Sequence, residues 1–470
     1  MQTHTNFLIR SSDALCIFIA GLILFTFGLH HQEIIGFESR FYLFALEMWR
    51  HGFSLFPTTY QTPYPDYPVT STALIYSTAK LFGTLNKWVA VFPSAIAAAA
   101  TLSGTYLLGA SQNRREGWYS VGFLLLTLAF LTEARTISLD MYVVACTTWI
   151  FYFAYSAQSK MRSPSWPVIY LLLILSFAIR GPIGIIIPTG VLCVFYLLEK
   201  NWKRLIFFGF SGALLLMLCT GILLSMAYYT GGHPFMQDVL RMQILGRMQV
   251  NRTPPHYFYF IESMGAYAIT YPLAIFFILK TLPQLFKKNA PPHIQWLRLL
   301  MGWVLVIMIG LSIPADKKIR YILPIAPALA LICSHFLTVV KNRYLGIAVF
   351  VFFIVNVFIV EKINLHTNQT REFVQHIEIL REQQKARLVF YREGKDGWAI
   401  KYLINTPREE NPLFVSDINQ LPVGPFFLIT SEENKNALSA VRTIASGSIG
   451  RDKVVVFFIN KNATPPSGGS

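Results

Sequence analysis

The sequence is poor in charged residues. Only 14 % of its 470 residues are Asp, Glu, Lys or Arg, whereas 54 % are hydrophobic. Soluble domains carry about 25 % charged residues, so this chain has too few to cover an ordinary solvated surface. Its net charge is +16, but no basic stretch interleaved with aromatic residues stands outside the hydrophobic segments. This argues against a nucleic-acid partner.

The chain also lacks the short motifs of many soluble enzymes. It has no glycine-rich phosphate loop, no HExxH helix and no nucleophile elbow. Its five cysteines lie in apolar stretches without metal-ligand spacing and are interpreted as small buried residues. His233 and His256 stand alone in one polar stretch, which supports a zinc site only weakly. The sequence therefore leaves the cofactor unknown, and a divalent metal has no clear set of ligands.

Long apolar segments are what the chain has instead. Its mean hydropathy is +0.46, and several apolar blocks reach the roughly 20 residues that cross a bilayer. We predict a mainly α, polytopic membrane protein with about eleven membrane helices. Two shorter amphipathic segments in the loop after the first helix, Arg40–Gly52 and Val69–Gly83, are predicted to be interfacial helices. The predicted membrane helices lie near residues 14–30, 88–109, 117–134, 141–157, 166–179, 182–199, 205–228, 262–280, 297–313, 321–339 and 344–361.

The placement of basic residues predicts the orientation of these helices. With the N-terminus in the cytoplasm, every inside connection is basic, as the positive-inside rule requires. The loops 31–87 and 229–261 and the C-terminal hundred residues then lie outside. The basic residues of the inside connections are Arg114, Arg115, Lys160, Arg162, Lys200, Lys203, Arg204, Lys280, Lys287, Lys288, Lys341 and Arg343.

Composition changes near residue 370. We predict a transmembrane domain over residues 1–361, a small α/β domain over 370–462 and a disordered tail over 463–470. Short β-branched and aromatic runs predict strands at Arg387–Tyr391, Pro412–Val415, Phe426–Thr430 and Lys453–Ile459. Helices are predicted at Arg371–Gln384, Trp398–Leu403 and Glu432–Ile444.

Three carboxylates on the predicted outer face are candidates for chemistry, because charges kept near a membrane usually have a partner or a role. Glu38 follows the first helix, two residues before Arg40, and the pair is also compatible with a solvated helix end. Asp66 lies between Pro65 and Pro68, where a simple turn is the alternative. Asp140 begins a helix and is also compatible with an ordinary helix cap.

Basic side chains gather on the same face, where the positive-inside rule would deplete them. Their clustering predicts an anionic partner, and phosphate suits guanidinium groups best. Carboxylates and cations together suit a phosphate-bearing lipid substrate. A carboxylate would take a proton from an acceptor hydroxyl while cations stabilise the departing phosphate. The basic residues are Arg180, Arg241, Arg247, Arg252, Lys317, Lys318 and Arg320.

The order of these motifs resembles that of the bacterial membrane glycosyltransferases of the protein mannosyltransferase and lipid A aminoarabinose transferase superfamily, which have the GT-C fold. Each motif alone is weak, but six occur in order between about residues 36 and 330. The matching stretches are Phe37-Glu38-Ser39-Arg40, Tyr64-Pro65-Asp66-Tyr67-Pro68, Glu133-Ala134-Arg135 with Asp140-Met141, Arg180-Gly181-Pro182, Leu245-Gly246-Arg247 with His256-Tyr257, and Lys317–Pro324.

The resemblance implies transfer of a sugar from a polyprenyl (undecaprenyl) phosphate donor to a lipid, such as lipid A, or a protein acceptor. It further implies inversion at the anomeric carbon and a periplasmic site in the bacterial inner membrane. Asp140, Glu38 and Asp66 would be the catalytic carboxylates. Arg180, Arg247, Lys317 and Arg320 would bind the donor phosphate. The residues expected to line the substrate site are Arg40, Tyr64, Tyr67, His256, Tyr257 and Tyr321.

The sequence departs from the family pattern at several positions. Phe37 stands where the family has its first acid, and Asp66 and Tyr67 replace Glu and Lys. In some members a histidine of the long loop helps bind metal, and the nearest position in this sequence is Ile244. The sugar, the acceptor and the metal requirement therefore stay open. A catalytically inactive lipid-binding relative is the alternative function, and a lipid or solute transporter is another.

Overall fold

Helices dominate the described part of the chain, as the hydropathy pattern predicts. The computed structural model describes residues 2–29, 32–34, 36–159, 165–246, 254–285, 287, 291–340, 347, 351, 354, 358, 369–395, 397–406, 411–438, 441, 443–450 and 452–460. The chain divides into two compact units, each described here by itself. The helical unit is Met1–Leu29, Gly52–Thr58 and Thr62–Val360, and the C-terminal unit is His30–His51, Thr59–Gln61 and Glu361–Ser470. Compared with the predicted domains, residues 30–51 and 59–61 join the C-terminal residues.

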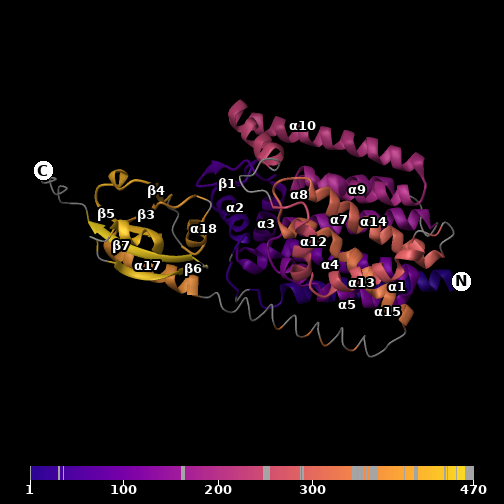
Figure 1. Cartoon of the computed structure of the whole chain (residues 1–470). Helices are drawn as coiled ribbons and strands as arrows, with labels where there is room; N and C mark the ends of the chain where they lie inside the picture. The colour runs from indigo at the N-terminus through magenta and orange to yellow at the C-terminus, as the bar shows by residue number, and fades with distance from the viewer. Residues whose placement is uncertain are drawn as a thin grey trace. The chain divides into compact units, whose positions relative to one another are not determined.

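The helical unit is a bundle in which α10 runs along the edge, beside α9 (Figure 1). Near its far end α10 is interrupted at Gly231 and Gly232, which have non-helical backbone angles. The short strands β1 (Thr58–Thr59) and β2 (Thr62–Pro63) pair in the loop that follows α2. The helices are α1 (Gln2–Thr26), α3 (Thr70–Phe82), α4 (Lys87–Gln112), α5 (Arg114–Leu126), α6 (Leu128–Ala134), α7 (Leu139–Gln158), α8 (Trp166–Arg180), α9 (Pro182–Leu198), α10 (Trp202–Leu240), η2 (Arg241–Leu245), α12 (Phe258–Ala266), α13 (Thr270–Leu285), α14 (Pro292–Ser312), η3 (Ile319–Ile325) and α15 (Ala326–Val340).

The described helices coincide with ten of the eleven predicted membrane segments, and the eleventh, 344–361, lies almost entirely outside the described residues. Within the described residues, four helices are long and apolar enough to cross a membrane, or six if each of two bent pairs is one span. Three shorter apolar helices, Ser11–Thr26, α8 and α9, come in addition. The count of eleven crossings stays a prediction.

Two predicted membrane segments are broken helices. The predicted helix 117–134 bends by 78° between α5 and α6, and the predicted helix 262–280 bends by 119° between α12 and α13. Thr127, at the first break, and Thr270, at the second, share a buried hydrogen bond of 3.0 Å between their Oγ1 atoms. The Cys333 Sγ also donates to the Thr270 carbonyl over 3.4 Å. A broken helix in a membrane needs such partners, because lipid offers none.

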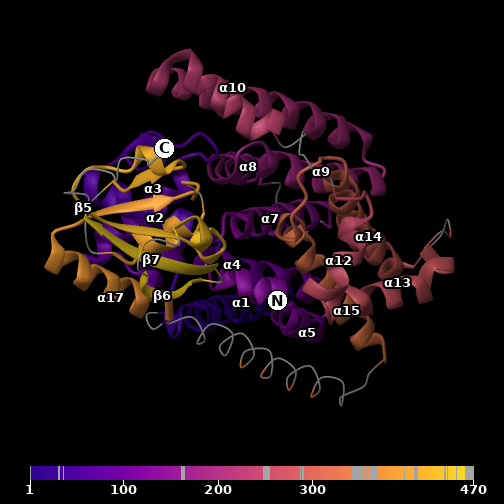
Figure 2. The same ribbon diagram turned by 60° about the vertical axis from the view of Figure 1, so that its left-hand side comes forward.

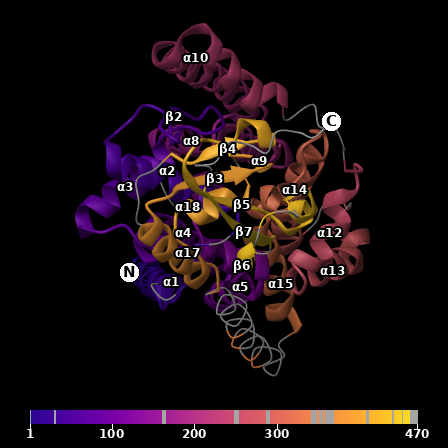
Figure 3. The same ribbon diagram turned by 90° about the vertical axis from the view of Figure 1, so that its left-hand side faces the viewer.

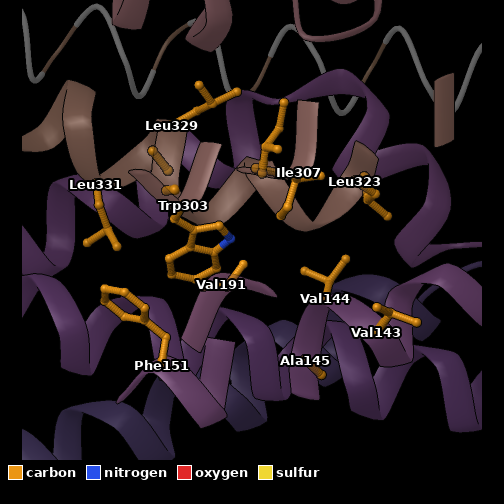
Figure 4. Packing of buried hydrophobic residues seen from close by; sticks show 14 of the residues in the cluster. Val143, Val144, Ala145, Phe151, Val191, Trp303, Ile307, Leu323, Leu329 and Leu331 are labelled. Carbon is orange, nitrogen blue, oxygen red and sulfur yellow. The ribbon is translucent and has the colours of Figure 1, made fainter. Parts of the chain in front are cut away.

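The helices of the bundle pack through small residues at some contacts and through aromatic rings at others. In α4, small residues allow close approach: a Cβ at Gly109 would lie 2.9 Å from the backbone of Gly117 on α5. Elsewhere, large rings fill the space (Figure 4). The ring centroids of Trp303 of α14 and Phe151 of α7 lie 4.7 Å apart, with the rings tilted by 37°. Trp303 also donates its indole N–H to the Pro324 carbonyl over 3.0 Å. This packing holds η3 against α7.

The C-terminal unit is built on a five-stranded mixed sheet of order β4-β3-β5-β7-β6. Strand β3 is parallel to β4 and β5, whereas β7 is antiparallel to β5 and β6. Helices α17 and α18 pack on one face of the sheet (Figures 2 and 3). The elements are α2 (Glu38–His51), α17 (Gln369–Gln384), β3 (Arg387–Tyr391), α18 (Trp398–Leu403), β4 (Leu413–Val415), η4 (Ile418–Gln420), β5 (Pro425–Ser431), η5 (Glu432–Leu438), β6 (Thr443–Ile449) and β7 (Asp452–Asn460).

The predicted helix Glu432–Ile444 is wrong in its second half. A short 3-10 helix ends at Leu438, and Thr443 begins the edge strand β6. Gly450, with a φ of +66°, forms the turn that folds β6 back on β7. Long-range pairing thus overrides local helix propensity here. The predicted tail, 463–470, lies outside the described residues.

Candidate active site

Asp140, Arg180 and Arg320 meet in the helical unit, although 40 and 180 residues separate the carboxylate from the two arginines. Asp140 lies in the first turn of α7, Arg180 is the last residue of α8, and Arg320 belongs to η3. The Nε of Arg180 donates to Asp140 Oδ1 over 2.7 Å, and Arg320 Nε lies 3.6 Å from Oδ2. Asp140 is 6 % and Arg180 3 % exposed. Two guanidinium groups are therefore held at one buried carboxylate.

The Arg180 guanidinium keeps donor capacity beyond this ion pair. Its Nη1 is buried and has no hydrogen-bond partner among the described residues. Buried donors are nearly always paired, so this one calls for an explanation. A ligand oxygen bound beside the ion pair would supply the missing partner.

Two tyrosine rings fix the orientation of that guanidinium. Arg180 lies 5.7 Å from the ring centre of Tyr67 and 5.3 Å from that of Tyr321. Tyr67 stacks on Tyr64 at 6.5 Å, and the Tyr321 hydroxyl donates to Asp316 Oδ2 over 3.0 Å. Such cation–π contacts orient a cation without neutralising it. The predicted residues Tyr67 and Tyr321 thus both contact the predicted phosphate-binding arginine, and Tyr64 packs against Tyr67.

The Glu133-Ala134-Arg135 motif positions Asp140 from outside the cluster. Arg135 donates to the carbonyls of Leu24 and Phe27 over 2.8 and 2.9 Å, which satisfies the C-terminal end of α1. Glu133 accepts a hydrogen bond from the hydroxyl of Ser138, the residue that precedes α7. These contacts fix the start of α7 and hence the position of its first-turn carboxylate.

Gln243, which was not predicted from the sequence, lies next to Gly181, the residue that follows Arg180. Gln243 of η2 is buried and donates its side-chain amide to the backbone carbonyl of Asp66. Its Oε1 would lie 2.6 Å from a Cβ at Gly181, where φ is +70°. Only glycine suits both the backbone angle and the space. The position of Gln243 between the apolar residues Met242 and Ile244 was a sequence signal for it.

The other predicted site residues of this unit differ in their burial and their contacts. Lys317 is buried and donates its Nζ to the Pro254 carbonyl over 3.2 Å. The ring nitrogen Nδ1 of His256 lies 3.2 Å from the Ser312 carbonyl, while Tyr257 is 60 % exposed. Asp66 is partly buried. Arg247 lies outside the described residues.

Glu38 and Arg40 belong to the C-terminal unit, where both lie on α2. Glu38 is buried, and Arg40 lies 5.8 Å from the ring centre of Phe37. Phe37, which stands at the family's acid position, packs edge-on against Phe41 with centroids 5.1 Å apart. An apolar contact thus occupies the position where a carboxylate was expected.

The described residues do not fit a bound metal ion. They contain no group of three His, Cys, Asp or Glu side chains that could hold one. At the cluster itself, the carboxylate of Asp140 is engaged by two guanidinium groups. Those cations would repel a divalent ion, so we assign no step to a metal.

Comparisons with known proteins agree on the fold. Residues 66–228 match the sequence model of the family described as Dolichyl-phosphate-mannose-protein mannosyltransferase. The crystal structure of ArnT from Cupriavidus metallidurans bound to undecaprenyl phosphate has a TM-score of 0.69 with this chain, at 15 % identity, over 98 % of this chain and 99 % of that one. The archaeal oligosaccharyltransferase AglB from Archaeoglobus fulgidus, in complex with an inhibitory peptide and a dolichol-phosphate, gives 0.56 at 11 % identity, over 91 % of this chain and 70 % of that one.

One relative in sequence is an uncharacterized protein of Aquifex aeolicus (strain VF5). It is 27 % identical over 249 residues, which is 51 % of this chain and 53 % of that protein. The chain thus spans about half the length of this curated relative. The family model and the solved structures confirm the expected resemblance: the chain has the GT-C fold seen in ArnT, and residues 66–228 resemble the mannosyltransferase family in sequence.

Proposed function

We propose that this protein is a glycosyltransferase that moves a sugar from a polyprenyl-phosphate donor to a lipid or protein acceptor. The observation that carries the proposal is the buried guanidinium of Arg180, which is held by Asp140 and retains an unpartnered Nη1. A planar cation with donors to spare is suited to a phosphate oxygen. The polyprenyl phosphates named with ArnT and AglB support this choice of ligand.

In the proposed reaction, the acceptor oxygen bonds to the anomeric carbon of the donor sugar. The bond from that carbon to the phosphate oxygen breaks, and the polyprenyl phosphate leaves with the electron pair. Arg180 and Arg320 stabilise the negative charge that grows on the leaving phosphate. Lys317 and Arg247 are further candidate phosphate ligands. Inversion at the anomeric carbon follows from a single displacement.

The proton of the acceptor hydroxyl must pass to a carboxylate. We assign Asp140 to positioning, because its two oxygens already face guanidinium groups, Oδ1 that of Arg180 and Oδ2 that of Arg320. Asp66 and Glu38 are the candidate bases. Asp66 is partly buried, whereas Glu38 is buried.

We further propose that the protein lies in a bacterial inner membrane, with the N-terminus in the cytoplasm and the C-terminal unit in the periplasm. The basic inside connections support this orientation. It places the Arg180 cluster on the periplasmic side.

The test is transfer of a radiolabelled sugar from polyprenyl-phosphate donors by the purified full-length protein. We expect Asp140→Asn to lower turnover about 100-fold, since misplaced arginines lose the charge stabilisation of the leaving group. Whichever of Asp66→Asn and Glu38→Gln removes the base should lower turnover about 100-fold or more. Asp13→Asn, which removes the carboxylate of an ion pair whose arginine is 56 % exposed, is the control.

Two outcomes would contradict the proposal. Turnover that is unchanged in all three site variants would rule out the site. No turnover with any donor, combined with tight binding of polyprenyl phosphate, would favour the inactive lipid-binding relative, a function that the apolar packing of Phe37 makes the second candidate.

A further inference from the structure

The C-terminal unit contains a cavity of about 400 Å³ between α2 and the α/β sheet domain. One wall comes from the start of α2, and the other comes from the loop before α18, from α18 itself and from the start of β7. Cavities of a few hundred Å³ are of the size that holds a small-molecule ligand. The lining residues that matter to the argument are Phe37, Arg40, Glu393, Trp398, Lys401 and Asp452.

The charges around the cavity are balanced. Lys401 Nζ pairs with Asp452 Oδ2 over 3.1 Å, and the lysine side chain is 17 % exposed. Glu393 and Arg40 add one more charge of each sign. A phosphate group would need an excess of positive charge, so the balance favours a neutral ligand.

Aromatic groups and one unsatisfied donor complete the lining. Phe37 offers a partly exposed ring next to Arg40. Trp398 is 5 % exposed, and its indole Nε1 is buried without a hydrogen-bond partner among the described residues. A ring surface combined with donors and acceptors of both charge signs suits a molecule that carries apolar C–H faces and many hydroxyl groups.

Local backbone features keep the charged groups in place. A Cβ at Gly450 would lie 2.7 Å from Lys401 Nζ, so the glycine of the β6–β7 turn leaves room for the ammonium group. At Gly397 a Cβ would lie 1.8 Å from Glu393 Oε1, so this glycine makes room for the carboxylate. Burial raises the pKa of Glu393, and the backbone N–H groups of Trp398 and Ala399 oppose that rise. The cavity is therefore a built polar site.

We infer that this cavity binds a neutral saccharide, the headgroup of the acceptor, and that the C-terminal unit thereby contributes to acceptor recognition. The identification of this saccharide as part of the acceptor rests on the proposed glycosyltransferase function. The cavity itself recognises a polyhydroxylated ring whatever the reaction. Carboxylates and cations bind the hydroxyls, and Phe37 covers a C–H face.

The binding test uses the full-length protein in nanodiscs and saturation-transfer NMR with methyl glycosides of glucose, galactose, mannose and N-acetylglucosamine. Glucose 1-phosphate serves as the anionic probe. In the double variant Lys401→Gln with Asp452→Asn, we expect affinity for the preferred glycoside to fall roughly tenfold or more, because two charge-assisted hydrogen bonds are weakened. Both partners become neutral amides of similar shape, so no buried charge is left alone.

The matched control neutralises another ion pair of the same unit. Glu432 and Lys453 pair at 3.9 Å and are 53 % and 79 % exposed, and neither lines the cavity. The variant Glu432→Gln with Lys453→Gln should bind glycosides as the wild type does. If the first double variant proves unstable, Arg40→Gln on the opposite wall replaces it, with the same expected loss.

Three results would overturn the inference. These are a wild type that binds none of the four glycosides, cavity variants that bind them unchanged, and glucose 1-phosphate binding about tenfold tighter than methyl glucoside. In transfer assays the cavity variants should raise the acceptor KM and leave the donor KM unchanged. Because glycoside binding needs no turnover, loss of binding in the variants supports the cavity even if the proposed transfer fails.

Discussion

Two ion pairs of the helical unit show how burial sets the role of a charged residue. In both, an arginine Nε lies 2.7 Å from an aspartate oxygen: Arg114 with Asp13, and Arg180 with Asp140. The first arginine is 56 % exposed at its side chain, whereas the second is 2 % exposed. Water can replace the partner of Arg114, but nothing but protein or ligand can replace the partner of Arg180.

We therefore expect Asp140→Asn to destabilise the folded protein by about 3–5 kcal/mol, since it leaves a buried guanidinium without its counter-charge. The thermal unfolding midpoint of the detergent-solubilised protein measures the loss. Asp13→Asn should shift that midpoint little. Equal shifts in the two variants would contradict the buried role of Asp140.

At the scale of elements, a few close contacts decide how the helices cross. Glu116 of α5 accepts from Trp296 Nε1 of α14 over 3.1 Å, and its other oxygen lies 3.2 Å from His335 Nδ1 of α15. Glu116 directly follows the basic pair Arg114 and Arg115 in the sequence, yet it is 2 % exposed. At the α8–α9 crossing, a Cβ at Gly184 would lie 2.1 Å from the Ser176 carbonyl oxygen. Helix α8 ends in Arg180, so this crossing also positions the site.

The variant Gly184→Ala should cost about 1–3 kcal/mol, because the added methyl forces α8 and α9 apart. It should also lower sugar transfer through displacement of Arg180. Thermal unfolding and the transfer assay measure the two effects.

Gly190→Ala on the same helix is the control. Its Cβ would lie 3.7 Å from Val306 Cγ2, an ordinary contact, and alanine favours the helix by up to about 1 kcal/mol. An unfolding midpoint for Gly184→Ala at or above that of Gly190→Ala would show that the crossing tolerates a side chain.

At the scale of the whole molecule, the chain combines a helical unit that exposes apolar residues with a C-terminal unit that buries them. Helix α10 illustrates the first: its apolar residues are largely exposed, as in Ile206, Phe210 and Ile222. Exposed apolar surface of this extent is stable in lipid and not in water. The C-terminal sheet, in contrast, buries its apolar residues on both faces.

The proposed orientation predicts which residues a membrane-impermeant maleimide reaches in intact cells. In a chain whose five cysteines are replaced, Lys395→Cys should be labelled without permeabilisation. Lys203→Cys should be labelled only after it. Both positions are exposed in the structure. The reverse pattern would invert the orientation and move the Arg180 cluster to the cytoplasmic side.

Local sequence was sufficient for the positions of most elements. Apolar runs located most helices, although α1 begins and α10 ends about twelve residues beyond the predicted bounds. The strand predicted at Arg387–Tyr391 and the helix predicted at Trp398–Leu403 have the bounds of β3 and α18. Hydropathy and β propensity are properties of short segments, so they predict these elements from the sequence alone. The bends at Thr127 and Thr270 and the strand β6 could not be predicted in this way, since each depends on a partner far along the chain.

The sequence by itself determined that this is a membrane protein, where its helices lie and which polar residues need a reason to be there. Only the tertiary structure decided which of them meet. It joined Asp140 to Arg180 and Arg320, added Gln243, and set Phe37 and Arg40 at a cavity lined by Glu393, Lys401 and Asp452. The reason is physical: a charge in an apolar sequence signals the cost of burial, whereas the partner that offsets the cost is found only when distant helices pack together.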